Sequence, residues 1–425
     1  MLIPGSDVCV DIEKPAAGGR MIARHEGQIL LVAGAIPGER VKATIERVEK
    51  RLAFAFATSV LESSPDRRAA HDPLCGGCVY AHIAYPRQVA LKGDIIADAF
   101  IRIGRIALSE RVSVMPSPEY GYRLRARLHV RENAAGFYRE GTHTLCDARQ
   151  TRQLSSGAMD AVDAALAALG DARSAVTSLE LSENISADER ALHFDITGEA
   201  PAIGPSLARA VETAGLSGCT ARGRTGALAP VGRPTVFDPL STLTNGRAVS
   251  GRLGRQPASF FQGNRFVLPE LVVTVLDAVP LHGAVLDLYA GVGLFSVALA
   301  ATGHARITAV EGDRASSSDL RENATDYSGA IDVVAGRVED FIRRPRERVN
   351  TIVVDPPRTG ISREAMDAVV AHGADRVVYV SCDPPTMARD ARRLLDGGYR
   401  LTSLAGFDLF PNTPHVESVG VFDLS

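Results

Sequence analysis

Hydrophobic and polar positions follow three different patterns along the chain, and each pattern predicts a different architecture. Residues 1–62 hold short alternating runs, such as QILLVAG and VKATIERV, between glycine-containing turns, which predicts a small OB-like β-barrel. Residues 63–250 mix strand-like runs with a helical stretch at 159–170, which predicts an α+β domain. Over residues 251–425, apolar strands alternate with helical stretches, which predicts a parallel α/β sheet with helices on both faces. A helix at 86–104 is expected to pack on this C-terminal domain.

Composition and charge limit the possible partners. The chain of 425 residues is 45% hydrophobic and 23% charged, and no apolar stretch approaches the roughly 20 residues of a membrane span. No membrane partner is therefore expected. The N-terminus has no basic region followed by an apolar one, so a cytoplasmic location is expected. A net charge of −3 argues against coating nucleic acid by bulk charge, but arginines cluster at 123–131, and arginine suits phosphates and stacked bases.

Cys382 has the most distinctive setting among the six cysteines. Six cysteines are too few for a disulfide scaffold at this length, so each is a core filler, a metal ligand or a reactive thiol. Cys382 follows the apolar run VYVS, and Pro384 and Pro385 then open a helix whose N-terminal dipole favours a thiolate. Such a thiolate is a nucleophile, although a buried structural thiol fits the position alone equally well.

The stretch LDLYAGVGLFS predicts a cofactor turn between a strand and a helix. Tyr289 ends the strand, and Gly291 and Gly293 allow a tight turn that presents backbone N–H groups to a ligand. Glu311 ends the next strand, where a carboxylate accepts from ribose hydroxyls. A dinucleotide site prefers a glycine where Ser296 stands, so a nucleoside cofactor other than NAD is favoured.

Two further carboxylates complete the pattern. Asp355 precedes two prolines at the tip of another strand, and proline fixes the chain there because it cannot continue a ladder. The glycine turn, Glu311 and this DPP stretch together indicate an S-adenosylmethionine-dependent methyltransferase. Glu417 lies beside the last strand in apolar surroundings, which suits a general base, whereas a solvated edge carboxylate is the alternative.

The chain resembles a known family over nearly its whole length. It is similar to the RNA 5-methyluridine (uracil-5) methyltransferases, which have a TRAM-like OB barrel, a middle domain and a Rossmann-like S-adenosylmethionine-dependent domain. The motifs that carry the resemblance are GGRMIARHEGQILLVAGAIPGERV, SPDR, CGGC, GYRLRARLHV, GFYRE, SFFQGN, DLYAGVGLFS, DPPRTG, SCDPPTMARD and FPNTPHVE. The last four, in this order, are highly specific.

The resemblance implies a covalent mechanism and a set of roles. The Cys382 thiolate adds to carbon 6 of uracil, carbon 5 then accepts the methyl group, and Glu417 removes the carbon 5 proton so that the thiolate leaves. Phe260 is implied to stack near a uracil extruded from the RNA. The implied cofactor-binding residues are Gln262, Tyr289, Gly291, Gly293, Glu311 and Asp355. The implied partner is ribosomal or transfer RNA, bound by the barrel and middle domain of a monomeric enzyme.

One departure from the family concerns a metal. Many relatives bind a 4Fe-4S cluster through four cysteines, but Ala69 and Thr151 stand at two of those positions here. Cys75 and Cys78 remain as weak metal candidates, with Cys146 and His71 as imperfect substitutes. Because a cubane cluster normally takes four thiolates, an intact cluster is not expected.

Two other functions compete with this hypothesis. A methyltransferase acting on an exocyclic amine of a nucleic acid needs a DPP-type loop but neither Cys382 nor Glu417. A non-catalytic RNA-binding factor needs only the barrel and the arginine-rich middle. An NAD-dependent oxidoreductase is disfavoured by Ser296.

Overall fold

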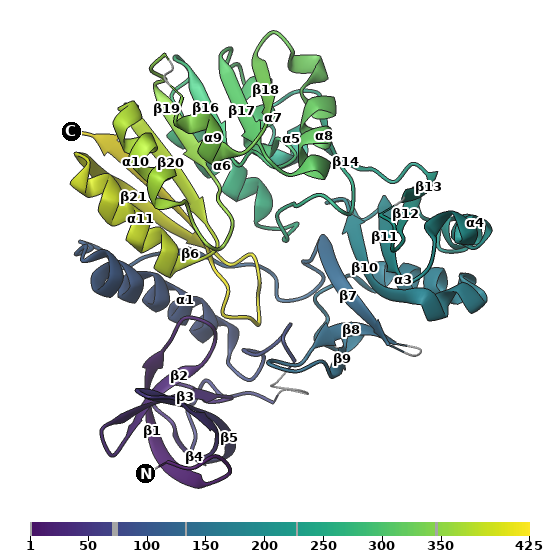
Figure 1. The fold of residues 1–425 in the computed structure, drawn as a ribbon. Coiled ribbons are helices and arrows are strands. Elements are labelled where there is room, and N and C mark those ends of the chain that lie inside the picture. The colour runs from purple at the N-terminus through teal and green to yellow at the C-terminus, as the bar shows by residue number, and fades with distance from the viewer. Residues whose placement is uncertain (1, 70–74, 132–133, 227, 345–346) are drawn as a thin grey trace.

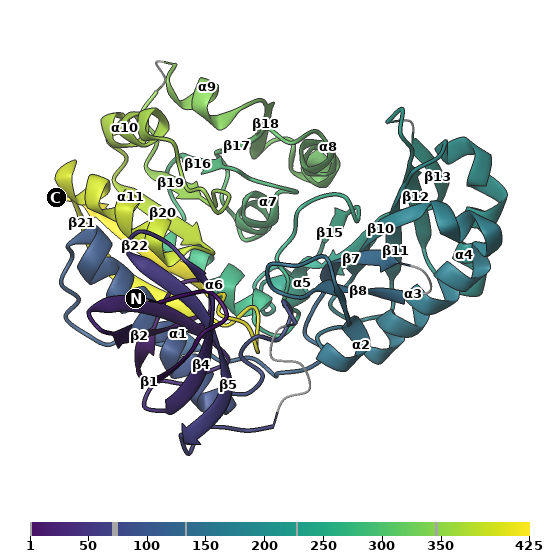
Figure 2. The ribbon, with the colours of Figure 1, turned by 60° about the horizontal axis from the view of Figure 1, so that its bottom comes forward.

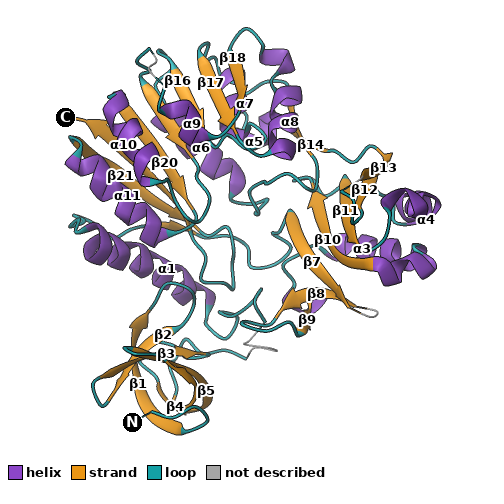
Figure 3. Cartoon of the chain, in the orientation of Figure 1, coloured by secondary structure: helices purple, strands orange, loops and turns teal. Residues whose placement is uncertain are grey.

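In the described part of the chain, three large sheets and one two-stranded ribbon organise the fold (Figure 1). The structure is a computed structural model that describes residues 2–69, 75–131, 134–226, 228–344 and 347–425. A closed barrel lies at the bottom of Figure 1, a seven-stranded sheet at the right and an eight-stranded sheet at the upper left. Figure 3 shows these sheets in orange in the same orientation.

The N-terminal barrel has the strand order β1-β2-β3-β5-β4 and closes by pairing β1 with β4. Its strands are β1 (Asp7–Pro15), β2 (Met21–His25), β3 (Gln28–Ala33), β4 (Arg40–Val48) and β5 (Leu52–Glu62). Alternate residues of β4 point inward, so Val41, Ala43 and Ile45 are buried. Glu26 and Gly27 both have positive φ, which is the two-residue hairpin geometry that suits strand twist. The predicted OB-like barrel is confirmed.

The middle of the chain forms a sheet with the order β13-β12-β11-β10-β7-β8-β9. Its strands are β7 (Arg125–Arg131), β8 (Ala134–Tyr138), β9 (Leu145–Asp147), β10 (Val176–Glu183), β11 (Arg190–Ile196), β12 (Gly218–Arg222) and β13 (Leu228–Gly232). The accompanying helices are α2 (Ala148–Thr151), α3 (Ser156–Ala168) and α4 (Gly204–Thr213). The ribbon that follows consists of β14 (Val236–Pro239) and β15 (Arg252–Arg255), joined through α5 (Leu240–Leu243).

The C-terminal sheet has the order β18-β17-β16-β19-β20-β22-β21-β6. Its strands are β6 (Val114–Met115), β16 (Val285–Leu288), β17 (Ile307–Glu311), β18 (Ile331–Ala335), β19 (Thr351–Val354), β20 (Arg376–Ser381), β21 (Tyr399–Phe407) and β22 (Glu417–Leu424). β16 to β20 run parallel, as the sequence predicts. β22 runs antiparallel to β20 because it returns from β21 through a hairpin, which the apolar pattern does not reveal.

Helices cover both faces of this sheet. They are α6 (Leu268–Ala278), α7 (Leu294–Ala301), α8 (Arg314–Asn323), α9 (Val338–Ile342), α10 (Arg363–His372) and α11 (Pro384–Asp396). Successive strand residues point to opposite faces, so Val353 packs in the core under α6, α7 and α8, while Ile352 and Val354 pack under α9, α10 and α11. The predicted Rossmann-like α/β architecture is confirmed.

Helix α1 (Tyr85–Ala99) and the π-helical turn Phe100–Gly104 connect the barrel with the C-terminal sheet. Leu91 packs in the barrel core, whereas Ile96 and Phe100 pack in the core of the C-terminal sheet. Figure 2 shows α1 beside β21 and β22. The division of the chain at residues 62 and 250 stays a prediction, because β6 and α1 lie with the C-terminal sheet. Within the described ranges, no helix has the length and apolar character needed to cross a bilayer.

Replacing Phe100 with alanine tests this connection. The side chain is fully buried, so we expect Phe100→Ala to lower the free energy of unfolding by about 3–5 kcal/mol through lost burial and a residual cavity. The adjacent Ile101 is 56% exposed, so we expect Ile101→Ala to change the free energy of unfolding by less than about 0.5 kcal/mol. Urea unfolding followed by far-ultraviolet circular dichroism measures both, and equal effects would contradict the connecting role.

Candidate active site

Cys382 and Glu417 lie opposite each other at one end of the C-terminal sheet. β20 and β22 pair antiparallel with Ser381 opposite Ser418, so the next step of the same register brings Cys382 opposite Glu417. Directly opposite residues place their side chains on the same side of the sheet, with Cβ atoms about 4.5–5.5 Å apart. Cys382 is half-buried and Glu417 is buried. The thiol and the carboxyl are therefore neighbours, and the thiol is not sealed inside a core.

Burial dominates the electrostatics of this pair. Burial first, and then the charges of Glu417 and Asp355, raise the pKa of Cys382 to about 12. Burial and the charge of Asp355 also hold the pKa of Glu417 well above the range of an ordinary carboxyl. Oε1 of Glu417 has no hydrogen-bond partner among the described residues. A carboxyl of raised pKa is suited to exchanging a proton with a bound ring.

Arg358 contacts Cys382 as well, a role that was not predicted from the sequence. Its guanidinium opposes the other effects by lowering the pKa of both Cys382 and Glu417, and it bonds to the thiol. Nη2 of Arg358 lies 3.5 Å from Nε2 of His415. Burial, together with Arg358 and other cations, lowers the pKa of His415 to about 4, so the neutral ring can accept from Arg358. The sequence could have indicated this role, because Arg358 directly follows the Asp-Pro-Pro stretch that begins at Asp355.

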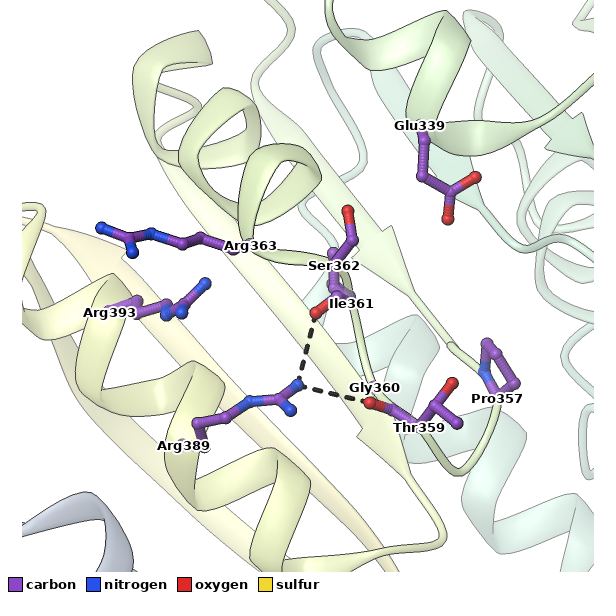
Figure 4. A pocket seen from close by; sticks show the side chains of 9 residues that line it. All are labelled: Glu339, Pro357, Thr359, Gly360, Ile361, Ser362, Arg363, Arg389 and Arg393. Atoms are coloured by element: carbon purple, nitrogen blue, oxygen red, sulfur yellow. Dashed lines mark hydrogen bonds between the residues drawn. The ribbon is translucent and has the colours of Figure 1, made fainter.

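The loop that carries Arg358 is held by helix α11. Nη2 of Arg389 donates to the carbonyl oxygens of Thr359 at 3.4 Å and Ile361 at 3.3 Å. Figure 4 shows these bonds at the wall of a pocket of about 360 Å³ that is separate from Cys382 and Glu417. Asp383 caps α11 by accepting from the backbone N–H of Thr386 at 2.9 Å. Helix α11 thus fixes both the loop that carries Arg358 and the segment that carries Cys382.

The predicted cofactor turn forms between β16 and α7. Gly291 and Gly293 have φ of 58° and 91°, and the N–H of Gly291 donates to Oε2 of Glu311 at 2.8 Å. Oε1 of Glu311 accepts from the N–H of Asp313 at 2.5 Å. Tyr289 also has a positive φ, 62°, and its hydroxyl donates to Glu339 at 3.0 Å. Strained backbone of this kind concentrates at functional sites.

Ser296 has a structural reason to replace the glycine of a dinucleotide site. Its backbone N–H donates to Oδ2 of Asp287 at 3.1 Å, and its hydroxyl donates to the same oxygen at 2.5 Å. Asp287 is fully buried, and desolvation raises its pKa to about 7. Ser296 therefore stabilises a buried carboxyl beneath the turn, which a glycine could do only through its N–H.

Asp355 and Gln262 meet beside Cys382. Nε2 of Gln262 donates to Oδ2 of Asp355 at 3.0 Å, and burial raises the pKa of Asp355 to about 7. Phe260 is 58% exposed, whereas the next residue, Phe261, is buried. The hydroxyl of Ser259 donates to Asp319 on α8 at 2.6 Å, which fixes this segment next to the cofactor turn.

These residues fit S-adenosylmethionine. A Cβ built on Gly291 meets nothing within 4 Å, so there is open space in front of the turn for a ligand. Glu311 lies at the end of β17, where its remaining lone pairs can accept from a ribose. The turn therefore combines free space, an N–H group and a carboxylate on adjacent parallel strands, which is the arrangement that nucleoside cofactors use.

The cysteines of the predicted metal candidate form a cluster in the middle of the chain. Cys75, Cys78 and Cys146 pack together, and a disulfide joins Cys75 to Cys146 with a Cα–Cα distance of 5.8 Å. The sequence placed Cys146 away from the ligand position, but the β8–β9 hairpin brings it to Cys75. His71 lies outside the described residues. Across the described ranges, no group of three or more His, Cys, Asp or Glu side chains is arranged to hold a metal ion.

Comparison with known proteins agrees with this geometry. The family model for tRNA (Uracil-5-)-methyltransferase matches residues 244–424, and the TRAM domain model matches residues 3–58. A protein of Methylococcus capsulatus named 23S rRNA (uracil(1939)-C(5))-methyltransferase RlmD is 32% identical over 443 residues, covering 99% of this chain and 98% of its own. An uncharacterized RNA methyltransferase of Aquifex aeolicus is 31% identical, covering 97% of each chain.

A solved structure shares the fold over nearly the same extent. It is the tRNA (uracil-54, C5)-methyltransferase of Pyrococcus abyssi in complex with S-adenosyl-L-homocysteine, with a TM-score of 0.76 and 22% identity. The match covers 97% of this chain and 99% of that one. With full-length relatives above 30% identity, a TRAM barrel and this catalytic fold, the chain belongs to the family of S-adenosylmethionine-dependent RNA uracil-5 methyltransferases.

Proposed function

We propose that this enzyme methylates carbon 5 of a uridine in 23S ribosomal RNA through a covalent bond between Cys382 and carbon 6 of the uracil ring. The observation that carries the proposal is the closeness of Cys382, which directly follows β20, to Glu417 at the start of β22 and to Asp355, whose charges both act on the thiol. Carbon 5 of uracil is too weak a nucleophile to take a methyl group unaided. A thiol and a carboxyl within reach of one ring supply the two missing functions, nucleophilic activation and proton removal.

The first step forms a carbon–sulfur bond. The thiolate of Cys382 adds to carbon 6, and the electron pair of the carbon 5–carbon 6 double bond moves onto carbon 5 and the O4 enolate. Because burial raises the pKa of Cys382 to about 12, the thiol is neutral before substrate binds, and its proton passes to water when the thiolate forms. Arg358 favours the thiolate by charge and by its hydrogen bond, so its role is to lower the cost of ionising the thiol.

The second step transfers the methyl group, and the third releases the product. S-adenosylmethionine, when bound at the turn of Gly291 and Gly293, supplies an electrophilic methyl group on a sulfonium. Gln262 and Asp355 lie where they can orient the ring. Glu417 then takes the proton from carbon 5, the carbon 5–hydrogen electron pair restores the double bond, and the Cys382 thiolate is expelled. Glu417 acts in this step as the carboxylate, after its own proton has passed to water, and its raised pKa makes that carboxylate a stronger base than an exposed one.

The comparisons support ribosomal RNA as the substrate class. The Methylococcus capsulatus relative, which aligns over 99% of this chain, is named for uracil 1939 of 23S ribosomal RNA. The neighbour named for transfer RNA is 22% identical and carries an argument about fold alone. The TRAM barrel and the half-exposed Phe260 support a single-stranded or extruded uridine, because aromatic rings stack on bases.

Deletion of the gene is expected to remove one 5-methyluridine. We expect nucleoside mass spectrometry to show its loss from 23S ribosomal RNA and not from transfer RNA, with recovery by the wild-type gene. A Cys382→Ala gene is expected to give no recovery, because no covalent adduct can form. Recovery of the 5-methyluridine by Cys382→Ala would contradict the covalent mechanism, whereas an unchanged 5-methyluridine content with loss of a methylated exocyclic amine would favour the exocyclic-amine methyltransferase. Loss from transfer RNA instead would contradict only the substrate class.

Replacing Glu417 with glutamine is expected to trap the methylated adduct. Cys382 still adds to carbon 6, but without a base the release step slows by about 10²–10⁴-fold. Denaturing gel electrophoresis of enzyme, RNA and S-adenosylmethionine with a labelled methyl group detects the trapped species. Glu364→Gln removes an exposed carboxylate from the first turn of α10, and we expect this control to turn over normally.

The same substitution is expected to stabilise the fold at high pH. The pKa of Glu417 is higher in the folded state than in the unfolded state, so folding favours the neutral carboxyl. The stability that this preference contributes is present at low pH and is lost as pH rises through the folded pKa. At pH 8 Glu417→Gln should therefore raise the free energy of unfolding by about 1 kcal/mol or more, and at pH 4.5 the gain should vanish. Urea unfolding at both pH values measures this. A pH-independent difference would show that the carboxyl is not held neutral.

A further inference from the structure

The loop 408–416, which joins β21 to β22, is held by side chains from distant parts of the sequence (the yellow loop near the centre of Figure 1). Oδ1 of Asn412 accepts hydrogen bonds from the side chains of Arg68 at 2.8 Å and Gln88 at 2.9 Å. The backbone N–H of Asn412 donates to Oε1 of Gln88 at 2.9 Å. Nδ2 of Asn264 donates to the carbonyl of Leu409 at 3.2 Å. The loop ends at Glu417, so these contacts act on the segment that carries the proposed base.

Lys92, on α1, is a further buried residue whose side chain bonds to this loop. Both Lys92 and Asp408 have fully buried side chains, and Nζ of Lys92 donates to Oδ1 of Asp408 at 2.5 Å. The other oxygen of Asp408 accepts from the hydroxyl of Tyr85 at 3.0 Å, and Oδ1 also accepts from the N–H of Phe410 at 3.2 Å. A buried charge persists only where it is paired and hydrogen-bonded, so this ammonium group fixes the position of Asp408.

Lys92 also fixes the far side of the loop. Nζ donates to the carbonyl oxygen of Phe410 at 3.0 Å, and the same oxygen accepts from the hydroxyl of Thr413 at 2.7 Å. The hydroxyl of Thr413 in turn accepts from the N–H of His415 at 3.3 Å. His415 faces Arg358, which contacts Cys382. One ammonium group on α1 is therefore connected, through three hydrogen bonds, to His415, which lies two residues before Glu417.

The two ends of the loop meet at Glu417. Phe407, the last residue of β21, pairs directly with Glu417, and Asp408 follows it. The backbone between Asp408 and Glu417 therefore forms a closed hairpin, and a shift of its first residue moves the last. Because the effect of a base depends on sub-ångström placement, a small shift of this hairpin is sufficient to slow proton transfer.

We propose that Lys92 is a positioning residue for the proton-removal step, and that it acts by clamping the loop 408–416 so that Glu417 faces carbon 5 of the covalently bound uracil. This inference rests on the proposed function above. It assigns a role in the chemistry to α1, a helix of the N-terminal half that touches neither the ring nor the cofactor turn. The role concerns product release more than thiol addition, because the loop leads directly into Glu417, whereas Cys382 lies between β20 and α11 and meets the loop only through Arg358, whose Nη2 is 3.5 Å from Nε2 of His415.

The test compares adduct formation with adduct release in single-turnover reactions. Wild-type and variant enzymes are mixed with a methyl-labelled S-adenosylmethionine and whichever transcript, 23S ribosomal or transfer RNA, the wild-type enzyme methylates. Lys92→Met leaves Asp408 buried without its cation and risks misfolding, so the double variant Lys92→Met with Asp408→Asn is included. The oxygen of the amide that Asp408→Asn introduces can still accept from the N–H of Phe410, and its NH2 group can donate to the hydroxyl of Tyr85, but the bond from residue 92 to the carbonyl of Phe410 is absent. We expect this folded double variant to form the adduct at nearly the wild-type rate and to release product about 10–100-fold more slowly.

Arg67→Met is the matched control. Arg67 pairs with the fully buried Glu39 in the barrel at 2.6 Å, so its loss also strips a buried carboxylate of its cation while every side chain that bonds to the loop 408–416 stays in place. We expect Arg67→Met to lower thermal stability without changing the ratio of release to formation. A folded double variant with the wild-type ratio, or with both rates reduced equally, would overturn the positioning role.

Glu417→Gln separates this inference from the function on which it rests. If Glu417→Gln traps the adduct while the double variant releases product normally, the proposed function stands and the role of Lys92 falls. If Glu417→Gln traps no adduct, both fall together.

Discussion

The antiparallel pairing of β20 with β22 is the constraint on which the site depends. Side chains alternate between the two faces of a strand. A register shift of one residue would therefore place Glu417 and Cys382 on opposite faces of the sheet. The strand itself cannot prevent such a shift, because its apolar residues pack on both faces. The loop before Glu417 fixes the register. Its backbone and side chains are hydrogen-bonded to the segment between the barrel and α1, to α1 itself and to the segment before α6.

The site gathers three carboxyls that the fold disfavours as anions. Desolvation raises the pKa of Asp287 and Asp355 to about 7 and raises that of Glu417 as well. Their burial costs stability near neutral pH, and Tyr289 adds backbone strain through its positive φ. The two apolar cores that enclose the sheet offset these costs. Carboxyls with raised pKa values can exchange protons near neutral pH, which suits a site that moves a proton.

The N-terminal half of the chain also contacts the loop that leads to Glu417. The methyltransferase family match begins at residue 244, yet Lys92, Gln88 and Arg68 hold the loop that leads to Glu417. Helix α1 packs on the barrel core at Leu91 and on the catalytic core at Phe100. The barrel and the C-terminal sheet are therefore joined through packed side chains and not through a flexible linker.

The sequence by itself determined the elements that depend on local chemistry. Apolar runs and turn residues identified the barrel, the parallel strands and the cofactor turn at Gly291, because hydrophobic period and positive φ are encoded within a few neighbouring residues. The motifs also identified Cys382 and Glu417 as candidates. Only the tertiary structure decided the direction of β22, the contact of Arg358 with Cys382, the approach of Cys146 to Cys75 and the burial of Lys92 against Asp408. Each of these joins residues that lie tens to hundreds of positions apart, and no local pattern specifies which distant partners a closed hairpin or a packed helix will bring together.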